Sequence, residues 1–95
     1  MNLLDKRPIK HPRTASRVIE GEAVIVVPEE DIVKVLNDVG SRIWELADGT
    51  RTVNEIGVLI HEEYEVSLEQ AEQDTREFVE ELIESGMMTF EEAQG

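Results

Sequence analysis

Residues 36–56 read LNDVGSRIWELADGTRTVNEI, and this stretch contains the start of one helix and the signals for the next. Asn37 and Asp38 are both suited to cap a helix, because short polar side chains accept hydrogen bonds from the free N–H groups at its start. The residues that follow have helical apolar spacing. The sequence therefore predicts a helix that carries Val39, Ile43, Leu46 and Ala47, with Trp44 beside them.

Asp48-Gly49 follows this helix and is typical of a helix end and a turn, because glycine readily adopts a left-handed conformation. Thr52 and Glu55 then have the spacing of a capping box. The second helix is expected to bury one stripe of apolar side chains. This stripe consists of Val53, Ile56, Leu59, Ile60 and Tyr64.

Ser67 and Gln70 form a second candidate capping box, and Gly86 provides a stop signal for the helix that it opens. Met87–Phe90 is expected to add a short strand or to pack back on the core. The apolar residues of this third helix recur at intervals of three and four. They are Leu68, Ala71, Thr75, Phe78, Val79, Leu82 and Ile83.

Upstream of the helices the pattern is that of strands. Arg17–Ile19 and Glu22–Val27 are β-branched segments on either side of a Glu-Gly turn, which predicts a hairpin. Asp31–Leu36 predicts a third strand, so the chain is expected to be an α+β domain with a three-stranded antiparallel sheet followed by three helices. Both parities of residues 23–27 are apolar, so we expect the second sheet face to be covered by the N-terminal arm, a second copy or a ligand.

The chain has 95 residues and a net charge of −13, with 22 acidic residues against 9 basic ones and no cysteine. Residues 1–15 are basic and contain two prolines, which predicts a flexible extended arm. The rest of the chain is strongly acidic. Because affinity for nucleic acid depends largely on Lys and Arg, generic nucleic-acid binding is not expected.

The sequence has no catalytic motif, no set of metal-binding residues and no cofactor-binding loop, so we expect no enzyme activity, no metal and no cofactor. The N-terminus does not resemble a signal peptide and no apolar run is long enough to cross a bilayer, which predicts a cytoplasmic protein without membrane association.

Gly40 and Gly57 fall inside predicted helices and suggest close packing there. Asp74 is expected to be exposed or locally hydrogen-bonded.

The third strand is expected to lie at the edge of the sheet. An open edge either is protected, here by Lys34, or accepts an extended peptide as a further strand.

Residues 36–46, the Asp-Gly-Thr-Arg-Thr turn and the third helix together resemble the PqqD-like family of peptide chaperones, also called RiPP recognition elements. The similarity extends from about Arg17 to Met88. It includes Glu63, Tyr64, Asp74, Phe78, Val79, Leu82 and Gly86.

The resemblance implies a winged-helix-like domain over residues 16–90, with residues 91–95 as a frayed tail. It further implies a non-catalytic adaptor that binds the leader of a ribosomally made precursor peptide and presents it to a modifying enzyme, commonly a radical SAM enzyme. The leader would add to the third strand, in a groove against the third helix. The implied peptide-binding residues are Ile32, Val33, Lys34, Val35, Leu36, Asp74, Thr75, Phe78, Glu81 and Leu82.

Two other interpretations remain open at this point. The three-helix order and the basic arm favour a winged-helix DNA-binding regulator, whereas the acidic helices oppose it. The chain is also compatible with an oligomerisation module, in which edge strands pair two copies into a homodimer.

Overall fold

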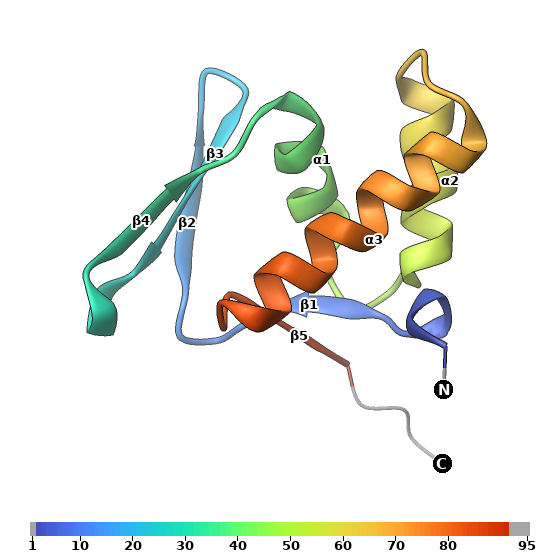
Figure 1. The fold of residues 1–95 in the computed structure, drawn as a ribbon. Coiled ribbons are helices and arrows are strands. Elements are labelled where there is room, and N and C mark those ends of the chain that lie inside the picture. The colour runs from blue at the N-terminus through green and yellow to red at the C-terminus, as the bar shows by residue number, and fades with distance from the viewer. Residues whose placement is uncertain (1, 92–95) are drawn as a thin grey trace.

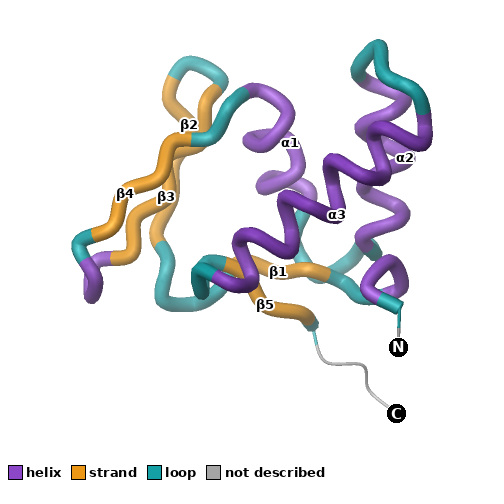
Figure 2. Tube along the Cα trace, in the orientation of Figure 1, coloured by secondary structure: helices purple, strands orange, loops and turns teal. Residues whose placement is uncertain are grey.

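The fold consists of a three-stranded antiparallel sheet followed by three helices, as predicted (Figure 1). The computed structural model describes residues 2–91. The sheet has the order β2-β3-β4, and the helices lie on one side of it (Figure 2). The elements are β2 (Ala15–Ile19), β3 (Glu22–Val27), β4 (Ile32–Val35), α1 (Asp38–Leu46), α2 (Val53–Glu63) and α3 (Leu68–Glu84).

The β2–β3 hairpin turns through Glu20 and Gly21, which both have positive φ, 52° and 84°. A two-residue turn of this kind matches the right-handed twist of the strands, and glycine adopts it without a steric penalty. The turn sets the register, in which Arg17 lies opposite Val24 and Val18 lies opposite Ala23.

Two of the three predicted helix caps form in full. The Asn37 side chain accepts a hydrogen bond from the Gly40 N–H at 2.8 Å. Thr52 and Glu55 make both bonds of the capping box. At α3 only half of the predicted box is present: Ser67 caps the Gln70 N–H at 3.0 Å, but the Gln70 side chain turns away from the helix start.

A second sheet of two strands corrects the expectation of a flexible N-terminal arm. A short 3₁₀ helix, η1 (Leu3–Asp5), precedes β1 (Pro8–Lys10), and β1 pairs antiparallel with β5 (Met88–Phe90). The short strand predicted near the end of the chain is therefore confirmed. Glu91 donates its N–H to the Arg7 carbonyl at 2.7 Å, and the remainder of the predicted frayed tail lies outside the described residues.

Tertiary contacts explain why this segment is ordered although its sequence has no apolar periodicity. Lys10 Nζ lies 5.3 Å from the centroid of the Trp44 ring. The Arg13 guanidinium donates to the Gly86 carbonyl at 3.1 Å and forms an ion pair with Glu30 at 2.7 Å. The basic residues of the segment thus bind carbonyl and carboxylate oxygens supplied by distant parts of the chain.

The core lies between the inner face of the sheet and the helices. Ala23, Ile25 and Val27 of β3 are fully buried there. Ser41 of α1 is buried with them: its Oγ accepts the Ala23 N–H at 2.7 Å and donates to the Leu36 carbonyl at 3.3 Å. This hydroxyl satisfies two buried main-chain groups at once and fixes α1 against the sheet.

The two helical glycines lie at close contacts, as predicted. A Cβ on Gly57 would lie 3.3 Å from the Glu72 Cα, so glycine lets α2 approach the main chain of α3. A Cβ on Gly40 would lie 3.0 Å from Phe78 Cε1, where α1 approaches α3.

Candidate functional site

Strand β4 has an open edge. Within residues 2–91 it pairs only with β3, with Lys34 opposite Ile25 and Val33 opposite Val26. Just beyond the strand, the Leu36 N–H donates to the Ala23 carbonyl at 2.9 Å. Because hydrogen-bonded and non-hydrogen-bonded pairs alternate along an antiparallel ladder, the main-chain groups of Val33 point away from β3. The same holds for Val35, so both residues offer N–H and C=O groups to an added strand.

The side chains of β4 alternate between two environments. Ile32 and Lys34 share the inner face with the core residues of β3 and are half-buried. Val33 and Val35 lie on the opposite face and are 64% and 59% exposed. A peptide added beside β4 would therefore meet the side chains of Ile32 and Lys34 on the helix side and those of the two valines on the outer face.

An ion pair links β4 to α3. Lys34 Nζ lies 2.9 Å from Glu81 Oε2, and both side chains are partly exposed. Lys34, which the sequence marked as protection of the edge, thus has a partner across the space between strand and helix.

A hollow of about 310 Å³ lies where β4 leads into α1. Its apolar lining comes from α1 and α3, and its polar lining consists of Asn37 and Asp74. Gln70 Nε2 donates to Asp74 Oδ1 at 2.7 Å, which is the local hydrogen bond expected for that aspartate. We call β4, α3 and this hollow the candidate groove. The residues that line the hollow are Asn37, Val39, Gly40, Ile43, Asp74 and Phe78.

The structure does not bring all ten predicted peptide-binding side chains to this groove. Thr75 and Leu82 are fully buried and Leu36 is 4% exposed, because these residues lie on the core stripe. The side chains of Val33 and Val35 point to the outer face of the sheet, away from the helices. The side chains that the groove does bring together are Ile32, Lys34, Asp74, Phe78 and Glu81.

Part of the hollow was missed by the sequence interpretation. The start of α1 supplies four of the lining residues, which are Asn37, Val39, Gly40 and Ile43. From the sequence these residues are interpreted only as a helix cap, core residues and a close-packed glycine. The available signal was position: a helix start that directly follows an edge strand places its first turn at the end of that strand.

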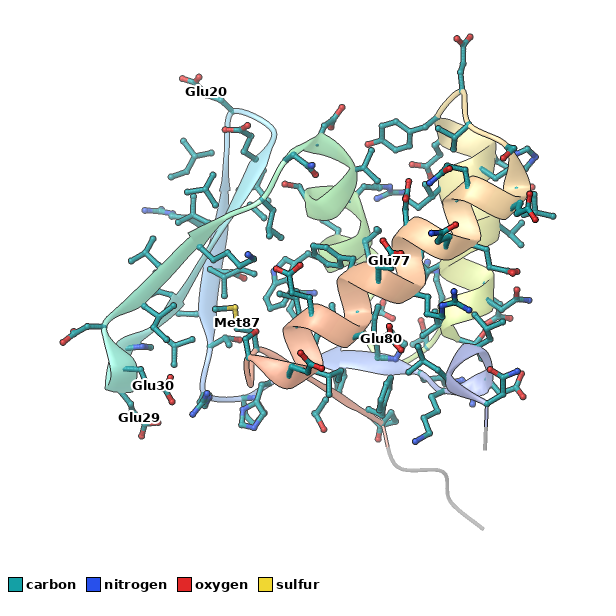
Figure 3. All side chains as sticks on the ribbon, in the orientation of Figure 1. Glu20, Glu29, Glu30, Glu77, Glu80 and Met87 are labelled. Carbon is teal, nitrogen blue, oxygen red and sulfur yellow. The ribbon has the colours of Figure 1, made fainter. Side chains whose placement is uncertain are left out.

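The exposed side of α3 is unsuited to phosphate. Glu77 and Glu80 project from it (Figure 3), and Arg76 is the helix's one basic residue. A recognition helix for DNA needs Lys and Arg to neutralise backbone phosphates. The DNA-binding interpretation is therefore disfavoured. No helix in residues 2–91 has the length and apolar character needed to span a bilayer.

Comparison with known proteins agrees with this geometry. Residues 22–88, more than two thirds of the chain, match the family model of coenzyme PQQ synthesis protein D (PqqD). The chain belongs to the PqqD family. The match begins at β3 and ends at the first residue of β5, so it contains β4, α3 and the whole candidate groove.

Two solved structures resemble this PqqD-family chain over nearly its whole length. TbiB1, solved in complex with the TbiA(beta) leader peptide, is 28% identical with a TM-score of 0.77, over 92% of this chain and 99% of that one. A lasso peptide synthetase B1, complexed with a leader peptide, is 22% identical with a TM-score of 0.79, over 87% of this chain and 98% of that one. The second likeness shows the fold alone. No curated protein sequence matches the chain.

Proposed function

We propose that this chain is a non-catalytic recognition element that binds the leader of a ribosomally made precursor peptide and presents it to a modifying enzyme. The observation that carries the proposal is the open edge of β4 beside a hollow, in a member of the PqqD family. The 28% identical neighbour, which was solved with a leader peptide, supports it.

The leader adds to β4 as a fourth strand. Val33 and Val35 supply the main-chain donors and acceptors, since their partners on β3 leave these groups free. Main-chain bonding of this kind gives affinity with little dependence on sequence. The hollow then provides selectivity, because it accepts a side chain of suitable size and polarity.

The lining of the hollow predicts the anchor residue of the leader. Val39, Ile43 and Phe78 favour an apolar or aromatic side chain, and the carboxylate of Asp74 favours a donor or a positive charge next to it. A leader with an apolar anchor beside a basic residue fits this groove better than an acidic leader.

The modifying enzyme is the second partner. A radical SAM enzyme is our first candidate class, because the resemblance to the PqqD-like family implies a partner of this kind. We expect the complex to form in the cytoplasm, where a ribosomally made precursor is first available. A homodimer through edge strands competes with leader binding at β4, so we expect leader to dissociate any such dimer.

Amide hydrogen exchange with and without leader peptide tests the strand-addition proposal. The probe is the leader of the precursor encoded beside this chain. Protection is expected to rise at the Val33 and Val35 amides and to stay unchanged at Lys34, whose N–H already faces β3. Unchanged exchange at both valines in the presence of saturating leader would refute it.

A pair of phenylalanine variants separates the groove from general stability. Phe78→Ala removes part of the lining of the hollow, whereas Phe90→Ala alters β5, away from the groove. We expect Phe78→Ala to weaken leader binding by about tenfold or more and Phe90→Ala by less than about twofold. Thermal unfolding of both variants shows whether each remains folded.

A further inference from the structure

The outer face of the β2-β3-β4 sheet is apolar and uncovered within residues 2–91. The helices lie on the other side of the sheet, and side chains project freely from this one (Figure 3). The ordered N-terminal segment does not cover the face, because β1 pairs with β5 instead. The register assigns to this face Ala15, Arg17, Ile19, Glu22, Val24, Val26, Val33 and Val35.

The exposure of this face is unusual for β-branched side chains. Val33 is 64% exposed, Val35 is 59% exposed and Ile19 is 51% exposed. A shallow depression of about 320 Å³ lies over the β2–β3 half, with Arg17 at its lining. The largest apolar patch on a monomeric protein is often an interaction surface.

Area and charge argue against a second copy of this chain as the occupant. The face of three short strands is small beside a stable interface of standard size, which buries about 800 Å² per partner. Two copies would also bring together two chains of net charge −13. A partner that is held by an additional contact does not need the larger area.

Strand β4 connects this face to the candidate groove. Val33 and Val35 offer their main chain to the leader, and their side chains lie on the outer face. A partner bound to the outer face would therefore lie next to the leader. A leader that contacts both proteins raises the effective concentration of one for the other, typically to millimolar values. A small apolar contact is then sufficient to hold the enzyme on the outer face.

We propose that the outer sheet face is the docking surface for the modifying enzyme, which contributes an apolar patch and a carboxylate for Arg17. This inference rests on the proposed function, since the leader supplies the second contact. Arg17 has no ion-pair partner in residues 2–91, although the chain is rich in carboxylates. Glu22 is the other charged residue on the face and lies at the hairpin end.

The test uses the enzyme encoded beside this chain and the preformed complex of the chain with its leader. Val24→Glu combined with Val26→Glu places two charges on the outer face, on the central strand, whose main chain is not offered to the leader. Val18→Glu is the matched control, because Val18 is 51% exposed on the same sheet but lies opposite Ala23, on the inner parity. Arg17→Glu is a second test variant that changes only one exposed side chain.

Enzyme affinity is expected to fall at least about tenfold in the double valine variant and about three- to tenfold in Arg17→Glu. Val18→Glu is expected to change it by less than about twofold, and all variants are expected to keep leader affinity within about twofold. Unchanged enzyme affinity in both test variants overturns the inference. So does a wild-type dimer, seen by sedimentation, that the valine substitutions dissociate.

The two proposals fail in distinguishable ways. A wild-type chain that binds no leader removes the proposed function, and the docking inference with it. A chain that binds leader normally but whose outer-face variants bind enzyme normally removes only the docking inference.

Discussion

Lys34 Nζ lies 2.9 Å from the Glu81 carboxylate, so an ion pair joins the edge strand to the longest helix at the candidate groove. Both side chains are partly exposed to solvent, and such pairs contribute only about 0.2–1 kcal/mol. The ion pair is therefore weak. It covers the edge of β4 in the free protein, and a peptide strand added there would break it at a small cost in free energy.

Glu81→Gln is expected to raise leader affinity by about two- to fivefold, because the peptide no longer has to break this ion pair. Isothermal titration calorimetry of the leader measures the change. Glu77→Gln on the same helix is the control, since Glu77 accepts a hydrogen bond from Gln73 and has no ion pair with β4 among the described residues. A loss of affinity in Glu81→Gln would mean that Glu81 itself contacts the peptide.

The helical glycines are expected to differ in their response to alanine. At Gly57 the added Cβ meets the main chain of α3, which cannot move independently, so we expect Gly57→Ala to lower the free energy of unfolding by about 1–2 kcal/mol. At Gly40 the nearest neighbours are two side-chain ends, Asn37 Oδ1 and Phe78 Cε1, each 3.0 Å from the added Cβ. Gly40→Ala should leave stability within about 0.5 kcal/mol, because the gain in helix propensity offsets the displacement.

The two variants are expected to rank in the reverse order when leader affinity is measured. Gly40→Ala displaces Phe78 in the hollow and should weaken leader binding, whereas Gly57→Ala should leave leader binding unchanged. Urea denaturation and titration calorimetry on both proteins give the two readouts. Equal destabilisation by both substitutions would contradict this assignment.

Thr75 is fully buried, and its hydroxyl has no hydrogen-bond partner among residues 2–91. Thr75→Val keeps the shape and removes an unsatisfied polar group, so it should raise the free energy of unfolding by roughly 1 kcal/mol. Thr75→Ser removes the methyl group instead and should lower it. Leader affinity should stay within twofold of wild type in both variants. A large loss of binding in Thr75→Val would show that the hydroxyl meets the peptide.

Stability should depend on pH through Glu63. Arg42 of α1 donates two hydrogen bonds to Glu63 of α2, at 2.7 and 2.9 Å, and these bonds lower the pKa of Glu63 below its usual 4.5. Because the folded pKa is the lower one, the stabilisation is complete above pH 4.5 and is lost as the pH falls through the folded pKa.

The matching measurement is the thermal midpoint of wild type and Glu63→Gln as a function of pH. The variant should unfold about 2–4 °C lower at neutral pH, and the difference should vanish below the folded pKa. Glu62→Gln, which changes an exposed neighbour without an ion pair in the described chain, should show no such trend. A constant difference at all pH values would rule out the Arg42–Glu63 bonds as its cause.

The local elements of this protein were predictable because their signals are local. Asn37, Thr52 and Ser67 start helices where the sequence places them, since a capping side chain acts within three residues. The β2–β3 hairpin and the open third strand follow equally from short patterns of β-branched residues. These patterns, with the family resemblance, also lead to the expectation of a peptide groove between β4 and α3, which stays a prediction.

Tertiary structure alone decided which side chains of these elements are buried and which are exposed. The basic N-terminal segment is ordered because β5, eighty residues away, supplies the strand that β1 lacks. Thr75 and Leu82 are in the core, while Phe78 faces the groove, because the rotation of α3 is set by packing against α2 and the sheet. Which parity of β4 faces the helices depended on its pairing with β3. Such choices arise from contacts between distant residues, and no short stretch of sequence contains them.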